Sequence, residues 1–315
     1  MTSHSAIPPG FAPARHVPGV LVTLRPARRA LPLVFDSPHS GRDYPADFDH
    51  APPRDLLRRA EDAFVDELFE TAPAHGALFL KALFPRSYID PNRHEHEVDL
   101  SMLGEPWPHP VVESEKAEMG LGLIRRLIKG TVPIYDRGLR VEEVLARIEG
   151  FHRPYHLELA SLLDEAHRRH GGAWHVNCHS MRSAGRKRGQ SIPRADIVLG
   201  DRDGSSCGRD FTHFVAEFLA GLGYRVALND PFKGAELVAR FGRPEESRHS
   251  LQIEINRALY MDEDRIEKRP DFADFQRDVD RLVAAIAGFV AGRVSRGTAR
   301  AGSARPGDAP DRREE

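Results

Sequence analysis

Cysteine is scarce in this chain: Cys178 and Cys207 are the only two among 315 residues. Two cysteines are too few for a disulfide scaffold, and such low usage is typical of proteins from a reducing compartment. No apolar run approaches the length of a membrane span. The first sixteen residues also lack the continuous apolar segment of a signal peptide. We therefore expect a cytoplasmic globular protein.

An excess of charge of either sign is also lacking, since the formal net charge is −2 and the isoelectric point is about 6.8. A near-neutral chain exerts no long-range attraction on phosphates or anionic lipids, so we expect neither a nucleic-acid partner nor a membrane partner. Neither standard glycine-rich phosphate loop occurs. The sequence makes no prediction of the oligomeric state.

The two ends of the chain differ in composition from its middle. Residues 1–18 are rich in proline, serine and alanine, and we predict that they form a flexible arm. Residues 294–315 contain almost no large apolar side chain, and we predict a disordered tail there. Residues 19–293 between them are predicted to form a single domain.

Within this body, apolar runs typical of strands alternate with helical patterns. Strands are expected at 31–36, 77–83, 173–178, 195–199, 224–228 and 251–255, and helices at 54–69, 141–170, 211–222 and 271–290. Pro154 predicts a bend in the second helix. Mixed periodicity and several prolines between residues 94 and 138 indicate an excursion from the sheet. This order predicts a three-layer α/β sandwich with a mixed, mostly parallel sheet.

Histidines follow two of the expected strands close to the point where each strand ends. His179 comes directly after the run 173–178, and His39 comes shortly after the run 31–36. In open α/β sheets the carboxyl ends of the strands face the crevice where ligands bind, so both imidazoles are placed for chemistry. A single histidine at a strand end is more often a hydrogen-bonded structural residue. The occurrence of two favours a functional interpretation.

A carboxylate could complete a metal site with these two imidazoles. Two neutral imidazoles and one carboxylate, with a position left for water, form the ligand set of a catalytic zinc site, and His39, Asp62 and His179 would supply it. Asp66 lies four residues after Asp62 on the predicted helix 54–69, so it would share a face with it and could orient an imidazole or an arginine. A solvated helix face explains that pair equally well. Iron, cobalt or manganese would accept similar ligands.

Glu254 and several arginines supply further chemistry. An ionised carboxylate inside an apolar strand is costly unless it is paired, so Glu254 is expected to have a partner; it could also take a proton from water and return it to a leaving amine. Arg93 and Arg257 each follow a strand-like run and could clamp a carboxylate. This set suits hydrolysis of an amide in a small acidic substrate. Arg86 and Arg93, which flank Asp90, could instead form a surface ion pair.

Longer motifs extend this interpretation. They are Ser37-Pro38-His39-Ser40-Gly41, Asp62-x-x-x-Asp66-Glu67-Leu68, Tyr88-Ile89-Asp90-Pro91-Asn92-Arg93, Asn177-Cys178-His179-Ser180-Met181, Asp196-Ile197-Val198-Leu199-Gly200-Asp201, Asn229-Asp230-Pro231-Phe232-Lys233-Gly234 and Gln252-Ile253-Glu254-Ile255-Asn256-Arg257-Ala258-Leu259-Tyr260-Met261. Together they resemble the N-formylglutamate amidohydrolase family. The resemblance runs from about Leu33 to Asp262, which is nearly all of the expected folded body.

The resemblance implies a phosphorylase/hydrolase-like, zinc carboxypeptidase-like fold. It also implies hydrolysis of N-formyl-L-glutamate to L-glutamate and formate, the last step of one route of histidine degradation. The site residues that follow are zinc ligands at His39, Asp62 and His179, a base at Glu254, and substrate binding by Asn92 and Arg93, with Arg86 and Arg257 as further candidates.

One departure from the carboxypeptidase pattern leaves the acidic ligand open. That pattern places its acid three residues after the first histidine, where this chain has Arg42 beside Asp43. Asp43, Glu61 and Asp66 therefore remain alternatives to Asp62. The substrate also has alternatives, since a related deacylase or carboxypeptidase would act on another N-acyl amino acid or short peptide. A non-catalytic binding protein on the same fold is the third hypothesis.

Overall fold

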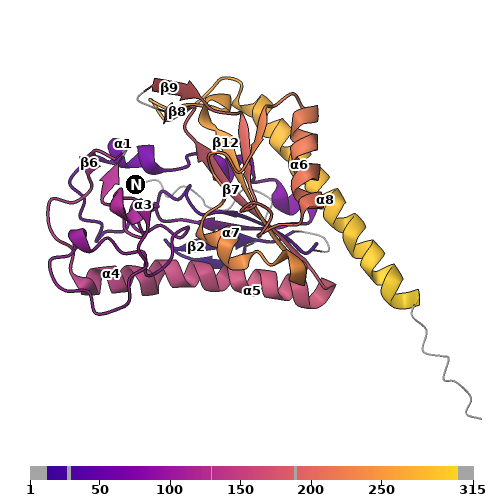
Figure 1. Ribbon diagram of the computed structural model, residues 1–315, viewed down its shortest axis with the longest axis horizontal. Coiled ribbons are helices and arrows are strands. Elements are labelled where there is room, and N and C mark those ends of the chain that lie inside the picture. Colours follow the sequence, from indigo (N-terminus) through magenta and orange to yellow (C-terminus); the bar gives the residue numbers. More distant parts are fainter. Residues whose placement is uncertain (1–12, 27–29, 129, 188–189, 304–315) are drawn as a thin grey trace, which may run out of the picture.

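The computed structural model describes residues 13–26, 30–128, 130–187 and 190–303 (Figure 1). Eight strands form the central sheet of this part of the chain. In spatial order they are β1 (Pro13–Val17), β2 (Leu21–Leu24), β4 (Leu78–Ala82), β3 (Leu33–Ser37), β7 (Ala173–Met181), β12 (Arg248–Asn256), β10 (Ile197–Gly200) and β11 (Val226–Leu228).

The sheet is mixed, and its centre is parallel. β4, β3, β7 and β12 run side by side in one direction, and β10 is parallel to β11. β2 is antiparallel to both β1 and β4, and β10 is antiparallel to β12. Because β3, β7 and β12 are parallel neighbours, their carboxyl ends meet at one edge of the sheet. This edge is where the sequence places His39, His179 and Glu254.

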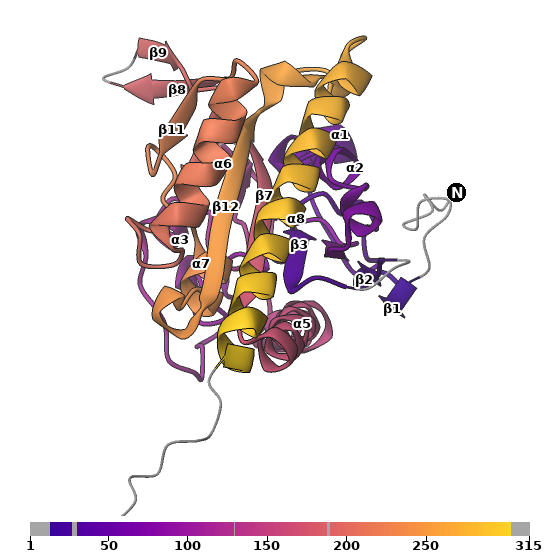
Figure 2. The same cartoon turned by 90° about the vertical axis from the view of Figure 1, so that its right-hand side faces the viewer.

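Helices cover both faces of the sheet, which confirms the three-layer α/β architecture. On one face α6 (Arg209–Gly221) and α8 (Phe272–Ser303) pack with apolar side chains of β3, β7 and β12 in one core (Figure 2). On the other face α4 (Val141–Arg147) and α5 (Arg153–His170) form a second core with Val34 and Leu80.

Shorter elements connect these layers. The short helices are α1 (Arg54–Leu57), α2 (Val65–Leu68), α3 (Glu115–Glu118), α7 (Glu236–Phe241) and the 3₁₀ turns η1 (Arg58–Ala60), η2 (Ala72–His75), η3 (Leu100–Met102), η5 (Pro244–Glu246) and η6 (Arg257–Leu259). The short strand pairs are β5 (Leu127–Ile128) with β6 (Val132–Pro133), β8 (Ala184–Lys187) with β9 (Gln190–Pro193), and β13 (Met261–Asp262) with β14 (Glu267–Lys268). The irregular segment expected at 94–138 is thus confirmed.

Polar and apolar side chains alternate along β7, although every residue of this strand is buried. Trp174, Val176 and Cys178 belong to the core beneath α6 and α8. Since successive side chains of a strand point to opposite faces, His175, Asn177 and His179 share the other face. β7 therefore extends three residues beyond the expected run and includes His179 itself.

The helix predicted at 54–69 is wrong. It is broken into α1, η1 and α2, with Glu61 in an extended conformation and Phe64 in the left-handed region at a φ of 66°. The reason is tertiary: the Asp62 amide donates to the carbonyl of His39 at 3.0 Å, and Ser40 Oγ donates to the Asp62 carbonyl at 2.9 Å. These bonds replace those of a helix, so Asp62 and Asp66 do not share a helix face.

The expected helix 141–170 is present, but a π-helical turn interrupts it near the position of the expected bend. α4 passes into the π-helical turn η4 (Ile148–His152) before α5 begins. Pro154 lies in the first turn of α5, where a missing amide is tolerated, and the wider turn precedes it.

The expected terminal segments differ from the structure in their extent. Residues 13–17 of the predicted arm form β1, which pairs with β2 through backbone hydrogen bonds. At the other end α8 continues to Ser303. The rest of the predicted arm and tail lies outside the described residues, and the single-domain division stays a prediction.

Two further observations bear on the expectations from composition. Cys178 and Cys207 are both free and buried. No helix of the described ranges has the length and apolar character that crossing a bilayer would require.

Candidate active site

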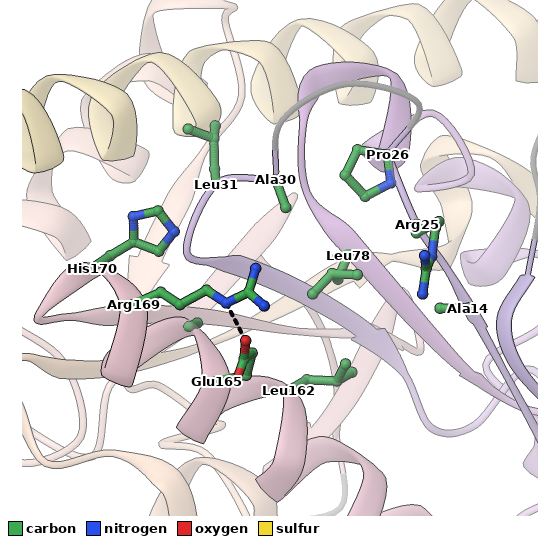
Figure 3. A pocket seen from close by; sticks show the side chains of 11 residues that line it. Ala14, Arg25, Pro26, Ala30, Leu31, Leu78, Leu162, Glu165, Arg169 and His170 are labelled. Atoms are coloured by element: carbon green, nitrogen blue, oxygen red, sulfur yellow. Dashed lines mark ion pairs between the residues drawn. The ribbon is translucent and has the colours of Figure 1, made fainter.

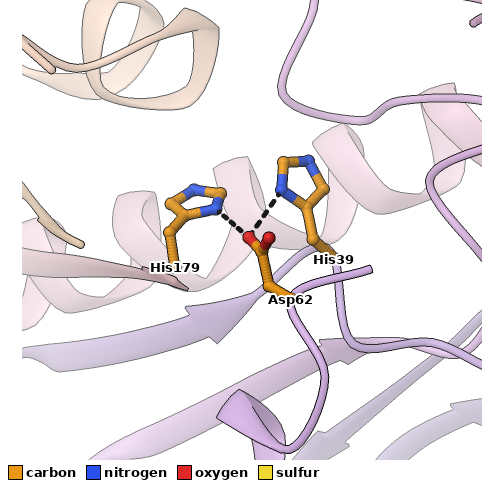
Figure 4. Close-up of side chains that lie close together, drawn as sticks. All are labelled: His39, Asp62 and His179. Atoms are coloured by element: carbon orange, nitrogen blue, oxygen red, sulfur yellow. Dashed lines mark hydrogen bonds and ion pairs between the residues drawn. The ribbon is translucent and has the colours of Figure 1, made fainter. Parts of the chain in front are cut away.

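His39, Asp62 and His179 converge at the carboxyl edge of the sheet (Figure 4). His39 lies in the loop after β3, Asp62 lies between η1 and α2, and His179 lies in β7. One ligand atom from each lies within 4.8 Å of the others, and all three side chains are buried. Asp62 Oδ2 is 3.1 Å from His39 Nδ1 and 2.9 Å from His179 Nδ1.

The second nitrogen of each imidazole is already engaged. Nε2 of His39 is 2.6 Å from Asp90 Oδ1, and Nε2 of His179 is 2.7 Å from Asn177 Oδ1. A neutral imidazole that donates its Nε2–H to these oxygens turns the lone pair of Nδ1 toward Asp62. Two lone pairs and a carboxylate oxygen facing one another are stabilised by a positive ion between them. The donor set therefore fits a divalent cation that prefers nitrogen and oxygen ligands, such as zinc.

Buried arginines hold the nearby carboxylates in their charged form. Arg86 donates to Asp90 Oδ2 from Nη2 at 2.8 Å, and its Nη1 is 3.4 Å from Asp62 Oδ1. Arg257 Nη2 donates to the same Asp62 oxygen at 3.0 Å. Burial by itself would raise the pKa of both carboxyls, but Arg86 and the imidazoles outweigh it and keep the pKa of Asp62 and Asp90 well below the usual range.

Glu254 lies directly opposite His179 in the register between β12 and β7. Burial is the main cause that raises its pKa to about 7; Asp62 adds to this effect, while His179 and Arg86 oppose it. A carboxyl group with a pKa near neutrality can both accept and return a proton, as a general base must. Glu254 was expected to have a partner, and it has one in a neutral amide: Gln252 Nε2 donates to Glu254 at 3.0 Å.

The residues expected to bind substrate lie near the group of His39, Asp62 and His179. Each of them also contacts other residues of the protein. Asn92 Nδ2 is 3.0 Å from His179 Nε2, and its Oδ1 accepts the amide of Leu237. Arg93 donates to the carbonyls of Leu121 and Asn92, each at 2.9 Å. Arg257 donates to Ser180 Oγ at 3.1 Å as well as to Asp62. Their role in substrate binding stays a prediction.

Among the acids left open by the sequence, Asp62 is the one that the structure groups with both imidazoles. Glu61 accepts a hydrogen bond from Tyr44 at 2.6 Å. Asp66 Oδ2 pairs with Lys81 Nζ at 3.1 Å, so the expectation that it holds an imidazole or an arginine is wrong. The break in the predicted helix explains this, because it turns Asp66 away from the face of Asp62.

The alternative interpretation of Arg86 and Arg93 as surface partners of Asp90 is also wrong. The Asp90 side chain is 0% exposed, and that of Arg86 is 12% exposed. Asp90 receives Arg86 on one oxygen and His39 on the other, so it belongs to the buried network that surrounds the imidazoles.

Residues 31–261 match the family model described as N-formylglutamate amidohydrolase. The chain belongs to this family. A solved N-formylglutamate amidohydrolase from Ralstonia eutropha is 44% identical with a TM-score of 0.83, and the alignment covers 89% of this chain and 99% of that one.

Two curated bacterial proteins are also similar to this chain. An N-formylglutamate deformylase from Pseudomonas aeruginosa is 27% identical over 265 residues, which cover 81% of this chain and 91% of that protein. One from Pseudomonas putida is 28% identical over 251 residues, which cover 74% and 83% respectively.

Three residues of the network around the candidate site, Asn177, Asp90 and Arg125, were not assigned to it from the sequence. Asn177 lies two residues before His179, so the two-residue period of a strand could have placed both on one face. Asp90 belongs to a quoted motif, but only a surface role was considered for it. Arg125 lies in the irregular segment between α3 and β5, and no local pattern marks it.

A separate hollow of about 720 Å³ lies beside α5, β1 and β4 (Figure 3). Apolar side chains such as Leu31, Leu78 and Leu162 line much of it. Arg169 pairs with Glu165 one helical turn earlier on α5. Among its described lining residues the hollow has one histidine, His170, and no group of two imidazoles and a carboxylate like that of His39, Asp62 and His179.

Proposed function

We propose that this chain is a metal-dependent hydrolase that cleaves the amide bond of N-formyl-L-glutamate to give L-glutamate and formate. Membership of the N-formylglutamate amidohydrolase family supports the substrate and the reaction. The observation that carries the mechanism is the buried group of His39, Asp62 and His179 with Glu254 opposite His179 on the next strand.

The proposed cation is held by Nδ1 of His39, Nδ1 of His179 and the carboxylate of Asp62. Zinc suits these donors, and iron, cobalt or manganese accept similar ones. When bound, such a cation acts as a Lewis acid on the formyl carbonyl and lowers the pKa of a water. Asp90 and Asn177 keep the two rings in the required orientation, because each accepts the other ring N–H.

Glu254 carries the proton through the reaction. It accepts a proton from the water whose oxygen forms a bond with the formyl carbon, and the carbon–nitrogen bond then breaks. Glu254 returns the proton to the departing amino nitrogen, so that formate and glutamate leave and the carboxylate is restored. The pKa of about 7 that burial causes at Glu254 suits both transfers at neutral pH.

Arginines balance the charge of a substrate with two carboxylates. Arg93 and Asn92 are proposed to bind a substrate carboxylate, with Arg86 and Arg257 adding positive charge. Arg86 and Arg257 also keep Asp62 ionised, which the proposed cation requires. We further propose that the reaction serves histidine degradation in the cytoplasm, where the two free cysteines would stay reduced.

The test combines metal content with turnover. Elemental analysis of the purified protein is expected to find a divalent metal, and formate release from N-formyl-L-glutamate should stop after chelation and return when zinc is added. N-acetyl- and N-succinyl-L-glutamate, assayed in parallel, test the acyl group. Failure of the metal-replete protein to hydrolyse the formyl compound would refute the proposed substrate.

Glu254→Gln separates catalysis from binding. The amide keeps the size of the side chain but cannot accept the proton, so turnover should fall by about 100-fold or more while the metal content stays the same. A variant with unchanged turnover would mean that Glu254 is not the base. Equilibrium binding of L-glutamate to the variant provides the control for an intact site.

A further inference from the structure

Arg125 is a buried guanidinium whose hydrogen-bonding capacity the protein itself does not use fully. The residue is only 9% exposed. Its Nη2 lies 3.5 Å from Asp90 Oδ2, but its buried Nε–H has no hydrogen-bond partner among the described residues. Asp90 Oδ2 also receives Nε and Nη2 of Arg86, at 3.1 and 2.8 Å. One carboxylate oxygen therefore serves two guanidinium groups, and Arg125 has the longer contact.

The charges around Arg125 also indicate that its guanidinium is incompletely paired within the protein. Burial is the main cause that lowers the pKa of Arg125 to about 9, and repulsion by Arg86 and Arg93 adds to it against the attraction of Asp90. Arg86, in contrast, has its pKa raised by Asp90 and Asp62 despite burial. A buried charge is costly, and a ligand carboxylate that binds the guanidinium would relieve that cost.

The position of Arg125 indicates which part of a substrate it could meet. His39 turns Nδ1 toward Asp62 and Nε2 toward Asp90, so Asp90 lies behind the ring as seen from Asp62. Arg86 bridges Asp62 and Asp90, whereas the contact of Arg125 is with Asp90. Arg125 therefore joins this network at Asp90, whereas Arg86 contacts both carboxylates. A distal substituent of a substrate, rather than the amide that is cleaved, is the group that fits this position.

We propose that Arg125 binds the side-chain carboxylate of the glutamate moiety and thereby selects dicarboxylate substrates over N-formyl amino acids with neutral side chains. This assignment rests on the proposed function. It adds the residue that recognises the second carboxylate. The planar fork of a guanidinium matches a carboxylate, so the interaction depends on geometry as well as on charge.

The first experiment compares two substrates that differ only in this group, N-formyl-L-glutamate and N-formyl-L-glutamine. Arg125→Gln should lower kcat/KM for the glutamate compound by about 100-fold, the usual scale for breaking a buried charge pair. It should leave kcat/KM for the glutamine compound nearly unchanged. Arg125→Lys, which keeps the charge but not the fork, should fall between Arg125→Gln and the unaltered protein. An equal loss on both substrates, or no loss on either, would overturn the assignment.

Arg126→Gln is the matched control. Arg126 is the next residue, its side chain is 36% exposed, and it donates to Asp99 at 2.7 Å. This variant should keep the preference for the glutamate compound. If Arg126→Gln removed the preference as completely as Arg125→Gln, the effect would belong to the segment and not to Arg125.

A binding measurement separates this proposal from the proposed reaction. Calorimetric titration of the metal-loaded protein with glutarate should give a dissociation constant about 10-fold or more weaker for Arg125→Gln than for the unaltered protein. If the unaltered protein hydrolyses neither formyl compound but this difference is found, the reaction is wrong and the carboxylate site stands. Equal affinities would refute the site. Arg125→Lys provides the same comparison should Arg125→Gln fail to fold.

Discussion

Two histidine–aspartate clusters lie on the same face of the sheet, and they use the same residue types in different ways. In the inner cluster, His175 Nε2 is 2.9 Å from Asp36 Oδ1 and His175 Nδ1 is 2.7 Å from Ser250 Oγ. Asp36 also accepts hydrogen bonds from Tyr155 and Asn177, each at 2.7 Å. Each polar group of this cluster has a partner within the protein, as a structural network requires.

The outer cluster, four residues further along β7, is arranged differently. His39 and His179 both turn Nδ1 toward a single oxygen of Asp62, and their ring centres are 4.6 Å apart. Hydrogen bonds within the protein satisfy the inner cluster, whereas the outer cluster brings one possible ligand atom from each of three residues within 4.8 Å of the others. This convergence of possible ligand atoms, rather than the mere presence of histidine and aspartate, is what supports the proposed metal site.

Removing one imidazole from each cluster should give the largest difference between the two clusters in metal content and turnover. His179→Gln is expected to lose the bound metal and at least about 1,000-fold of the turnover, since two ligands hold a divalent cation poorly. His175→Gln should keep the metal, because His175 faces Asp36 and Ser250. Elemental analysis and formate release measure both outcomes. A His179→Gln protein with full metal content would contradict the ligand assignment.

The inner cluster should instead contribute to the stability of the fold. Asp36→Asn replaces an acceptor of three hydrogen bonds with a group that also donates, so the free energy of unfolding is expected to fall by about 2–4 kcal/mol. Denaturant unfolding of the metal-free protein measures this loss. Asp280→Asn, at a half-exposed partner of His75, is the control and should change stability little. Similar values for the two variants would mean that the inner cluster has no structural role.

Asn177 connects the two clusters. A substitution there is expected to have a smaller effect than the loss of His179, and to act on metal affinity. Its Nδ2 donates to Asp36, and its Oδ1 accepts from His179 Nε2. Asn177→Ala should weaken metal affinity by about 10- to 100-fold, because the ring of His179 loses its orienting partner. Ser250→Ala removes a partner of His175 alone and should leave metal affinity unchanged. Competition with a chelator of known affinity measures both, and equal effects would show that the clusters are not connected in this way.

The sequence was sufficient for features that depend on residues near one another. Apolar runs located the central strands, and His39 and His179 were found because each follows such a run. Glu254 was found because an ionised carboxylate inside an apolar strand is costly unless it has a partner. Asn177 was within reach of the same reasoning, since it lies two residues from His179 in a strand.

Features that depend on contacts between distant segments could not be predicted from the sequence. The helical pattern at 54–69 is real, but the backbone of Asp62 bonds to the loop after β3, and that contact decides the local structure. Arg125 meets Asp90 because the segment 121–125 packs beside the Asp90 motif, where the carbonyl of Leu123 accepts the Asp90 amide at 2.8 Å. Neither contact has a local signal.

A third cluster is a pair of histidines that, among the described residues, hydrogen-bond to backbone carbonyls and to no carboxylate. His152 and His156 stack with their ring centres 4.1 Å apart, and their Nε2 atoms lie 2.9 and 2.7 Å from the carbonyls of Arg93 and Pro91. They thus hold the backbone on both sides of Asn92. Burial lowers the pKa of His152 to about 4, and burial together with His152 lowers that of His156 well below its usual value.

These two histidines should make the protein less stable in acid. Because their pKa values are lower in the folded chain than in the unfolded chain, the unfolded chain binds more protons below a pH of about 6.5, and stability is lost as the pH falls toward about 4. Between pH 7 and pH 5 His152 is expected to account for a loss of about 1–2 kcal/mol in the free energy of unfolding. Denaturant unfolding across this range should show a shallower pH dependence for His152→Gln than for the unaltered protein. His213→Gln, on the exposed face of α6, should retain the full dependence, and an identical slope in all three proteins would place the acid sensitivity elsewhere.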